Sequence, residues 1–414
     1  MRYRRASRLT ATLAALAALV SLSGCALLPG ETRETIPIPP ASAGSSSDSG
    51  FGPGVQALSF GPGDKGSPRM SPSGERISFV IDGRVAEKPL YSQDLSLRTG
   101  EDLYAEHAEW LPDDTLATLG ANERDQDVKT VVPSSLFARG EDVSTDDQEL
   151  VKRVEAVGAV PDGGLVAASE VPSASGSSEE QITSRLVLLK GPEKPMKFYL
   201  EGIEGRVSGL SISPDGNLAM LAVLRNGNGR GGAKRFEVQT YRFSDGRVSL
   251  AARLPEGVEI LGAPQWTSQG AYFVAGDAGS DAEAGPYALY RTVSGSEEPE
   301  PVSAVGEEFV AASANISPEG DRLAVIGRRN LGSPTNLYVL NLESGTLDTA
   351  TTNEDMEIKT NPRDLSWSSD GRSVILVARV ALTGPTIYDT PAEELSSAFY
   401  NLYQVPVGRP ENTQ

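Results

Sequence analysis

The chain has 414 residues, with 37 basic and 56 acidic side chains and a formal net charge of −19 at pH 7. So acidic a protein repels phosphate backbones and anionic headgroups, which excludes nucleic acid as a partner and direct adsorption to lipid. The single cysteine, Cys25, excludes a disulfide within the chain, so the fold has to be stabilised by packing.

Residues 1–24 have the layout of a secretory signal peptide. Four arginines precede a short run of Ala, Leu and Val, which is too short to span a membrane comfortably, and small residues follow. The segment ends in Leu22-Ser23-Gly24-Cys25, which resembles a bacterial lipobox. This resemblance implies cleavage before Cys25 and lipidation of that residue, because an ordinary signal would need no cysteine there. We expect an extracytoplasmic protein anchored to the cell membrane through more than one lipid chain.

Residues 25–54 are rich in Pro, Ser and Gly and have little to bury, so we expect a disordered tether. Removal of the signal leaves 33 basic and 56 acidic residues, a formal net charge of −23. Residues 55–414 remain for folded structure, enough for two average domains or for one large repeat fold.

One tight-turn motif recurs along this region and favours the repeat fold. It reads MSPSG at residues 70–74, ISPDG at 212–216, ISPEG at 316–320 and WSSDG at 367–371. Looser forms are LPDDT, VPDGG and WTSQG, and the turn glycine or its replacement falls at Gly74, Asp114, Gly163, Gly216, Gly270, Gly320 and Gly371. This spacing of 40 to 54 residues fits seven propeller repeats. In such a turn Pro fixes φ, Asp hydrogen-bonds nearby backbone and Gly takes a positive φ, so the motif aspartates are assigned to architecture and not to a metal or catalytic role.

A short apolar run follows each turn and is predicted to be a buried strand. The runs are 77–80, 116–119, 165–168, 218–221, 271–274, 323–326 and 374–377. A third strand is predicted in five units, at 90–95, 236–241, 287–290, 337–340 and 402–405. Small sheets with two apolar faces must stack on one another, and radial stacking closes into a ring. The sequence predicts an all-β chain forming one β-propeller of seven four-stranded blades, with a strand at Val55 to Phe60 completing the last blade.

The repeats resemble the TolB-like, or WD-like Pro-Asp, repeats of bacterial propellers over essentially residues 55–408. Lipobox, tether and propeller together are similar to actinobacterial lipoproteins that accompany a two-component sensor kinase, which implies a regulatory role at the cell surface. Those proteins carry another domain before the propeller, whereas here the tether leads almost directly into the repeats.

Loops between second and third strands emerge on one face of a propeller and hold most of the extra length here. Basic residues gather in the loops of the fourth, sixth and seventh units, so this face is a candidate docking site for an acidic envelope protein or an anionic polymer; solvated loop charges are the alternative. Residues 390–399 carry helix-start signals, with Thr at the cap, Pro after it and Glu at the third position, so they are predicted to form a short helix. The candidate partner-binding residues are Arg225, Arg230, Lys234, Arg235, Arg328, Arg329, Arg379 and Tyr388.

Catalytic signals are sparse. The one histidine, His107, lies in a predicted strand, where a structural role is favoured, and no nucleophile elbow, zinc spacing or phosphate loop is present. We therefore predict no cofactor and assign no catalytic or metal-binding residue. The favoured function is a monomeric binding scaffold, and the alternative is a calcium-dependent lactonase or hydrolase with a site at the channel mouth.

Overall fold

A computed structural model describes most of the chain from residue 51 to residue 408. The described residues are 51, 54–59, 61–92, 94–99, 103–111, 114–122, 125–133, 151–161, 163–171, 183–190, 196–226, 234–277, 287–353, 356–380 and 399–408. The predicted signal peptide, Cys25, the tether up to residue 50, and the predicted helix up to residue 398 lie outside them. Within the described ranges no helix is long and apolar enough to cross a membrane.

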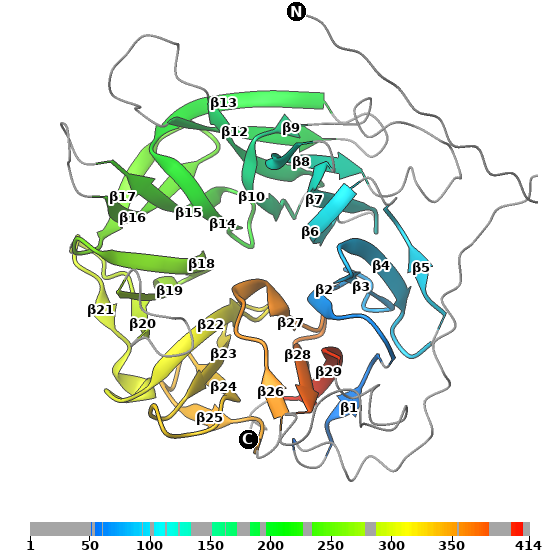
Figure 1. Cartoon of the computed structure of the whole chain (residues 1–414). Coiled ribbons are helices and arrows are strands. Elements are labelled where there is room, and N and C mark those ends of the chain that lie inside the picture. The colour runs from blue at the N-terminus through cyan, green and yellow to red at the C-terminus, as the bar shows by residue number, and fades with distance from the viewer. Residues whose placement is uncertain are drawn as a thin grey trace, which may run out of the picture. The chain divides into compact units, whose positions relative to one another are not determined.

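The described residues form a single all-β propeller, in which small antiparallel sheets surround a central axis (Figure 1). Six sheets have four strands each, in chain order from the axis outward. The first two are β2 (Lys65–Met70), β3 (Arg76–Ile81), β4 (Arg84–Pro89), β5 (Ser96–Leu97), and β6 (Leu103–Trp110), β7 (Leu116–Asn122), β8 (Asp125–Pro133), β9 (Val151–Lys152). The next two are β10 (Val154–Ala159), β11 (Leu165–Val171), β12 (Thr183–Lys190), β13 (Met196–Glu204), and β14 (Arg206–Ile212), β15 (Leu218–Arg225), β16 (Arg235–Arg242), β17 (Val248–Arg253). The last two are β18 (Val258–Thr267), β19 (Gly270–Asp277), β20 (Ala288–Arg291), β21 (Glu300–Pro301), and β22 (Val310–Ile316), β23 (Arg322–Arg328), β24 (Asn336–Asn341), β25 (Leu347–Thr349).

The remaining sheet corrects the expectation that seven blades would have four strands each. It contains five strands, in the order β1 (Gln56–Ala57), β29 (Asn401–Pro406), β28 (Ser373–Val380) and β26 (Met356–Ile358), with β27 (Leu365–Trp367) also paired to β28. β26 and β27 pair with opposite halves of β28, so they are two pieces of one inner strand. Residues 359–364 interrupt this strand, and Lys359 N donates to Val377 O at 2.9 Å across the break.

The recurrent turns join the first strand of a sheet to the second, as predicted. Ser213 Oγ accepts from Leu218 N at 2.9 Å, Asp215 Oδ1 accepts from Asn217 N at 3.1 Å, and Gly216 has a φ of 69°. Asp114, which replaces the glycine in its unit, has a positive φ of 59°. Asp215 is therefore used by the turn itself, and hydrogen bonds from the Ser213 hydroxyl and from Asn217 lower the pKa of its carboxyl group.

The predicted second strands all lie within observed strands, but one third strand was placed wrongly. Residues 90–92 and 94–95 lie between β4 and β5, outside any strand, and the third strand of that sheet is β4. Asp82 and Gly83, with φ values of 48° and 75°, close a two-residue hairpin between β3 and β4. An Asp-Gly pair between alternating strands is a strong hairpin signal, so the error was avoidable.

The core lies between neighbouring sheets. For example, Tyr272 and Leu289 of one sheet pack with Leu323 and Tyr338 of the next, all of them buried. The inner strands contact one another in the cyclic order β2, β6, β10, β14, β18, β22 and β27, and β27 in turn contacts β2. Each sheet thus has its apolar faces covered by its neighbours, which is the physical reason for the ring.

The N-terminal end of the propeller completes the five-stranded sheet, as predicted. β1 pairs with β29 through Gln56 and Gln404. Leu58 N donates to Leu402 O at 2.8 Å, and the Phe51 and Tyr403 rings pack edge to face with 5.2 Å between centroids. The outer edge of β29 is therefore covered by a segment more than 340 positions away in the chain.

Candidate functional site

The structure contains a cavity of about 780 Å³ on the face where the loops between second and third strands emerge, here called the loop face. Its walls come from the β23–β24 loop, from β26 with the segment that follows it, and from Tyr400 just before β29. The lining residues are Arg328, Ser333, Pro334, Thr335, Met356, Glu357, Ile358, Lys359, Thr360, Asn361, Asp364 and Tyr400.

Tyr400 is the centre of a charged cluster in this cavity. Lys359 Nζ and the guanidinium carbon of Arg379 each lie 4.5 Å from the Tyr400 ring centroid, which is within cation–π range. The Tyr400 hydroxyl donates to Glu357 Oε1, and Arg379 forms an ion pair with Glu357 Oε2 at 2.7 Å.

These contacts fix the protonation states in the cluster. Burial and the neighbouring Glu357 carboxylate raise the pKa of Tyr400, so its hydroxyl stays protonated. Burial alone would raise the pKa of Glu357, but hydrogen bonds from Tyr400 and Arg379 outweigh it, and the pKa falls. Tyr400 N also donates to Asp64 Oδ1 at 3.1 Å, so the cluster contains two cations and two carboxylates around a neutral ring.

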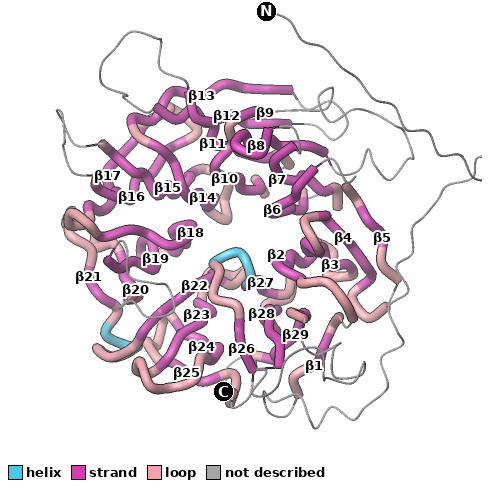
Figure 2. Tube along the Cα trace, viewed as in Figure 1, coloured by secondary structure: helices cyan, strands magenta, loops and turns pink. Residues whose placement is uncertain are grey.

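The floor of the cavity is the segment between β26 and β27, residues 359–364, here called the central segment. Its last three residues form a 3-10 turn, η3 (Pro362–Asp364), which Asn361 caps by accepting from Arg363 N at 2.9 Å. This turn lies at the centre of the ring in Figure 2, where it is cyan. It contacts β2, β18 and β22, so the central segment crosses the channel.

Close packing and polar contacts hold the central segment in place. A Cβ added to Gly262 of β18 would lie only 2.5 Å from Pro362 Cβ, so glycine is needed for this approach. On the other side Asp364 Oδ1 accepts from Ser67 N at 2.6 Å, and Lys359 Nζ donates to Lys65 O at 3.0 Å. Asp364 is 4% exposed, and burial raises its pKa.

A second set of charges joins the central segment to β2 and β6. Arg363 Nη1 is 2.9 Å from Glu106 Oε2, and Arg69 donates to Arg363 O at 3.0 Å. Arg69 also lies 3.4 Å from Glu109 Oε1, to which His107 Nε2 is hydrogen-bonded at 2.5 Å. These contacts connect the central segment to two neighbouring sheets.

His107 is 4% exposed, as a structural histidine would be. Burial and the charge of Arg69 lower its pKa to about 4, so the imidazole is neutral at pH 7 and Nε2–H donates to Glu109. Its Nδ1 makes no hydrogen bond to any described residue. His107 does not line the loop-face cavity, and its hydrogen bond to Glu109 stabilises the inner strand β6.

The predicted binding residues do not form one continuous basic patch. Arg328 lines the cavity, and Arg379 reaches it through Tyr400 and Glu357. Arg329 donates to Thr349 Oγ1 at 3.0 Å and lies 5.8 Å from the Tyr338 ring.

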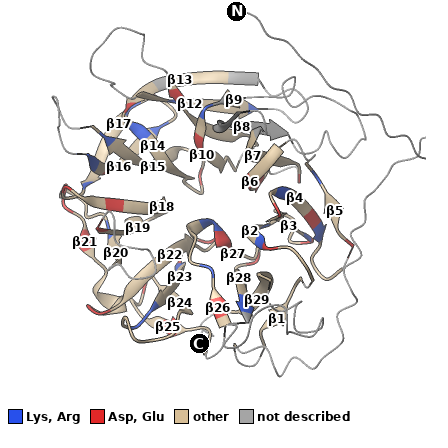
Figure 3. Ribbon diagram, in the orientation of Figure 1, with Lys and Arg blue, Asp and Glu red and all other residues tan. Residues whose placement is uncertain are grey.

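The other predicted residues lie elsewhere. Arg225 is ion-paired with Glu204 at 3.3 Å and with Glu237 at 3.2 Å. Lys234 and Arg235 are exposed at the start of β16, two sheets away from the cavity. Arg230 and Tyr388 lie outside the described residues. Figure 3 shows basic and acidic residues interspersed over the sheets.

Sequence reasoning missed Glu357, Lys359 and Asp364, which the structure places in the cavity. They lie in the stretch MEIKTNPRDLSW before the last turn, for which no strand range was predicted. Asn361 followed by Pro362 is a capping signal that marks a turn, and it was the one available clue.

Within the ranges that the structure describes, no group of three or more His, Cys, Asp or Glu side chains is placed to hold a metal ion.

No protein-family model and no curated protein matches this chain. Solved structures of β-propellers are similar to it at low sequence identity. An oligogalacturonate lyase in complex with manganese has a TM-score of 0.52 at 13% identity, over 86% of this chain and 93% of that one. An oligogalacturonate lyase from Vibrio parahaemolyticus has a TM-score of 0.50 at 13% identity, over 87% and 94% of the two chains. The β-propeller domain of the Trilobed protease from Pyrococcus furiosus, described as having an open velcro topology, has a TM-score of 0.50 at 12% identity, over 84% and 94%. At these identities the similarity shows the fold alone.

Proposed function

We propose that this protein is a lipid-anchored, extracytoplasmic β-propeller that binds an acidic protein segment or an anionic envelope polymer in the loop-face cavity. The signal layout and the lipobox at Cys25 support the anchor, and the composition of residues 25–54 supports a tether that gives the propeller reach. The combination of lipobox, tether and propeller, which is similar to that of actinobacterial lipoproteins accompanying a sensor kinase, supports a regulatory role at the envelope.

The observation that carries this proposal is the pair of cations around Tyr400. A lysine ammonium has three donors, and Lys359 gives one to Lys65 O. Arg379 uses Nε and Nη2 on Glu357, which leaves Nη1 without a hydrogen bond among the described residues. Hydrogen-bond donors of both cations therefore remain for a ligand, at the mouth of a cavity large enough to admit a chain segment.

Free hydrogen-bond donors, and not net charge, favour an anion over a cation as ligand. The cavity contributes Arg328 and Lys359 against Glu357 and Asp364, and its neighbours Arg379 and Asp64 add one charge of each sign. In a mature chain of net charge −23, a site whose charges balance repels an acidic partner less than the rest of the surface does. No observation in the structure specifically favours the calcium-dependent enzyme, so the binding role is the one proposed.

Binding of defined polyanions tests this proposal. The chain from Ala26 to Gln414, made without lipid, retains every described contact; poly-L-glutamate and inorganic polyphosphate serve as the probes. The double variant Lys359→Gln/Arg379→Gln should weaken binding of the preferred probe about tenfold, since each charge contact contributes up to about 1 kcal/mol.

The matched control is Arg247→Gln/Arg291→Gln, which removes two partly or fully exposed charges outside the cavity lining. It should leave the dissociation constant within about twofold of the wild-type value. Equal losses in both double variants would show that binding follows net charge and not the cavity, and would refute the proposed site.

A further inference from the structure

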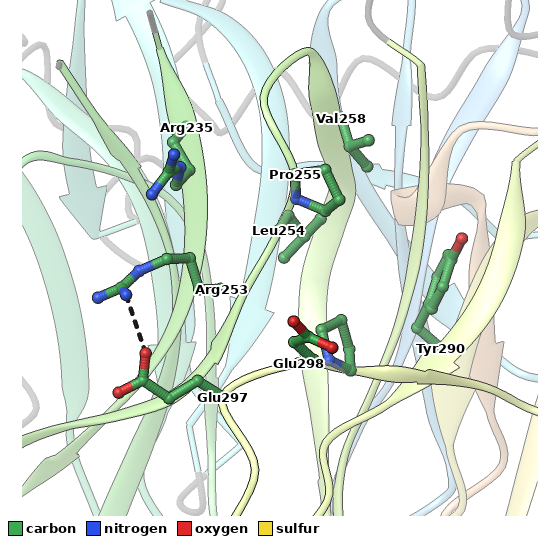
Figure 4. Close-up of a pocket in the computed structure, with 9 residues that line it drawn as sticks. Arg235, Arg253, Leu254, Pro255, Val258, Tyr290, Glu297 and Glu298 are labelled. Atoms are coloured by element: carbon green, nitrogen blue, oxygen red, sulfur yellow. Dashed lines mark hydrogen bonds and ion pairs between the residues drawn. The ribbon is translucent and has the colours of Figure 1, made fainter.

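A second concave surface, here called the rim groove, lies between two neighbouring sheets far from the loop-face cavity in sequence. Its volume is about 530 Å³, and Figure 4 shows the side chains around it. One wall comes from β16 and β17, and the other from β18, β20 and the loop between β20 and β21. The lining residues are Arg235, Arg253, Leu254, Pro255, Val258, Tyr290, Glu297, Glu298 and Pro299.

The groove exists because the outer part of the second sheet is short. β21 has only two residues and pairs only with Tyr290 and Arg291 of β20. Its neighbour β17 has six residues, so the two sheets do not match at the rim. The middle of the groove is apolar, with Pro255, Val258 and Tyr290 partly or fully exposed in it.

Most charges beside the groove neutralise one another. Glu237 is 6% exposed and lies 3.2 Å from Arg225 and 3.3 Å from Arg253. Arg253 also pairs with Glu297 at 2.8 Å, the contact drawn in Figure 4. The central wall of the groove is therefore an internally paired network.

Two exposed charges at the groove are not part of that network. The Arg235 guanidinium and the Glu298 carboxylate form no ion pair or hydrogen bond with any described residue, and Glu298 contacts Ser296 only through its backbone. In Figure 4, Arg235 lies at the upper left and Glu298 at the lower centre, below Leu254, while Val258 and Tyr290 lie to the right. A cation and a carboxylate without ion-pair partners among the described residues thus border the apolar part of the groove.

We propose that the rim groove binds an extended peptide segment of a partner protein in which an apolar side chain stands between an acidic and a basic residue. The acidic residue pairs with Arg235, the apolar one packs on Pro255 and Tyr290, and the basic one pairs with Glu298. This site is separate from the loop-face cavity and gives the proposed scaffold a second partner with different chemistry.

The size of the groove selects a peptide and not a globular surface. A stable contact between two folded proteins buries about 800 Å² on each side, whereas 530 Å³ accommodates only a few side chains. Alternating side-chain contacts with a groove are the usual way in which extended segments are recognised. A second copy of the chain is the competing occupant that the experiment must separate.

Fluorescence polarisation with three labelled, terminally blocked peptides tests the proposal on the chain from Ala26 to Gln414. The cores are Glu-Leu-Lys, Glu-Leu-Glu and Lys-Leu-Lys, each flanked by Gly and Ser. The mixed peptide should bind about 3- to 10-fold more tightly than the other two, since each rim ion pair contributes a fraction of a kcal/mol to about 1 kcal/mol.

Charge reversal then changes the preferred peptide. Arg235→Glu should favour Lys-Leu-Lys and Glu298→Arg should favour Glu-Leu-Glu, whereas the control Arg247→Glu should keep the wild-type ranking. An unchanged ranking in the first two variants would overturn the proposal. Sedimentation at 1 to 100 µM shows whether a second copy of the chain occupies the groove instead. A dimer that Arg235→Glu dissociates would also overturn the proposal of a peptide site.

Discussion

The N-terminal segment that completes the propeller is held by two buried lysines, and this arrangement predicts an unusual pH dependence of stability. Lys88 Nζ donates to Leu58 O, next to β1, and to Ser92 O at 2.7 Å. Lys65 Nζ donates to Gly61 O at 2.6 Å. Both side chains are 1% exposed, and burial lowers the pKa of each from 10.5 to about 8.

The direction of the effect follows from proton uptake. Between pH 8 and 10.5 the unfolded chain keeps a proton on each lysine that the folded chain releases, so the free energy of unfolding rises with pH. With these folded and unfolded pKa values, each lysine raises the free energy of unfolding by roughly 1.3 kcal/mol between pH 7 and pH 9. Burial raises the pKa of Tyr403 to about 12, so this residue lowers the free energy of unfolding as the pH rises above 10, outside the range from pH 7 to pH 9.

The perturbation is Lys88→Met, which removes one of the two titrating groups. Urea unfolding at pH 7, 8 and 9 at constant salt, followed by tryptophan fluorescence, gives the free energy of unfolding. In the wild type the two lysines together should raise the free energy of unfolding by roughly 2.6 kcal/mol between pH 7 and pH 9. In the variant this rise should be about half as large. At any one pH the variant also leaves Leu58 O and Ser92 O without a donor, so the change with pH is the informative quantity.

The matched control is Lys234→Met, which removes an exposed lysine at the start of β16. It should keep the full wild-type gain. A Lys88→Met protein that also keeps the full gain would refute the claim that the ammonium of Lys88 is buried against the closing segment.

Three further predictions concern the central segment, the histidine and the anchor. Gly262→Ala should destabilise the fold by about 1–3 kcal/mol in thermal unfolding, because the new Cβ meets Pro362. The control Gly345→Ala has a similar positive φ with open space around it, so it should destabilise the fold less. Equal destabilisation by the two variants would contradict the close approach of Gly262 and Pro362. His107 is the one histidine, so a proton NMR titration needs no assignment and should give a pKa near 4; a value at or above 6.5 would contradict its burial. Cys25→Ser should move the protein from the membrane fraction to the soluble fraction or leave it unprocessed, and unchanged fractionation with normal processing would exclude the lipid anchor.

Much of the fold was predictable because it depends on local signals that repeat. A turn needs Pro, Asp and Gly at fixed positions, and even the replacement of Gly by Asp at residue 114 was located correctly through its spacing. The pairing of residues 55–60 with the last strand was also predictable, since the last sheet lacked an outer strand in sequence and this segment was unassigned.

The candidate site was only partly predictable, because its geometry depends on contacts between distant residues. Lys359 and Arg379 are twenty positions apart and meet at Tyr400 because β26 pairs with β28 in the register that sets Glu357 opposite Arg379. Sequence reasoning identified Arg379 from its charge and loop position but could not foresee that Arg225 would be neutralised by Glu204 and Glu237. Charge can be counted in a sequence, whereas ion pairing requires the register between strands.

Site-specific photo-crosslinking in living cells tests the proposed function most directly. A photoreactive amino acid at Pro334, which is exposed and lines the loop-face cavity, is compared with the same residue at Ser344, exposed at the other end of β24. We predict an acidic protein or polymer adduct from position 334 that is absent at position 344 and that Lys359→Gln/Arg379→Gln diminishes about tenfold. Identical adducts from both positions, unaffected by the double variant, would contradict binding in this cavity.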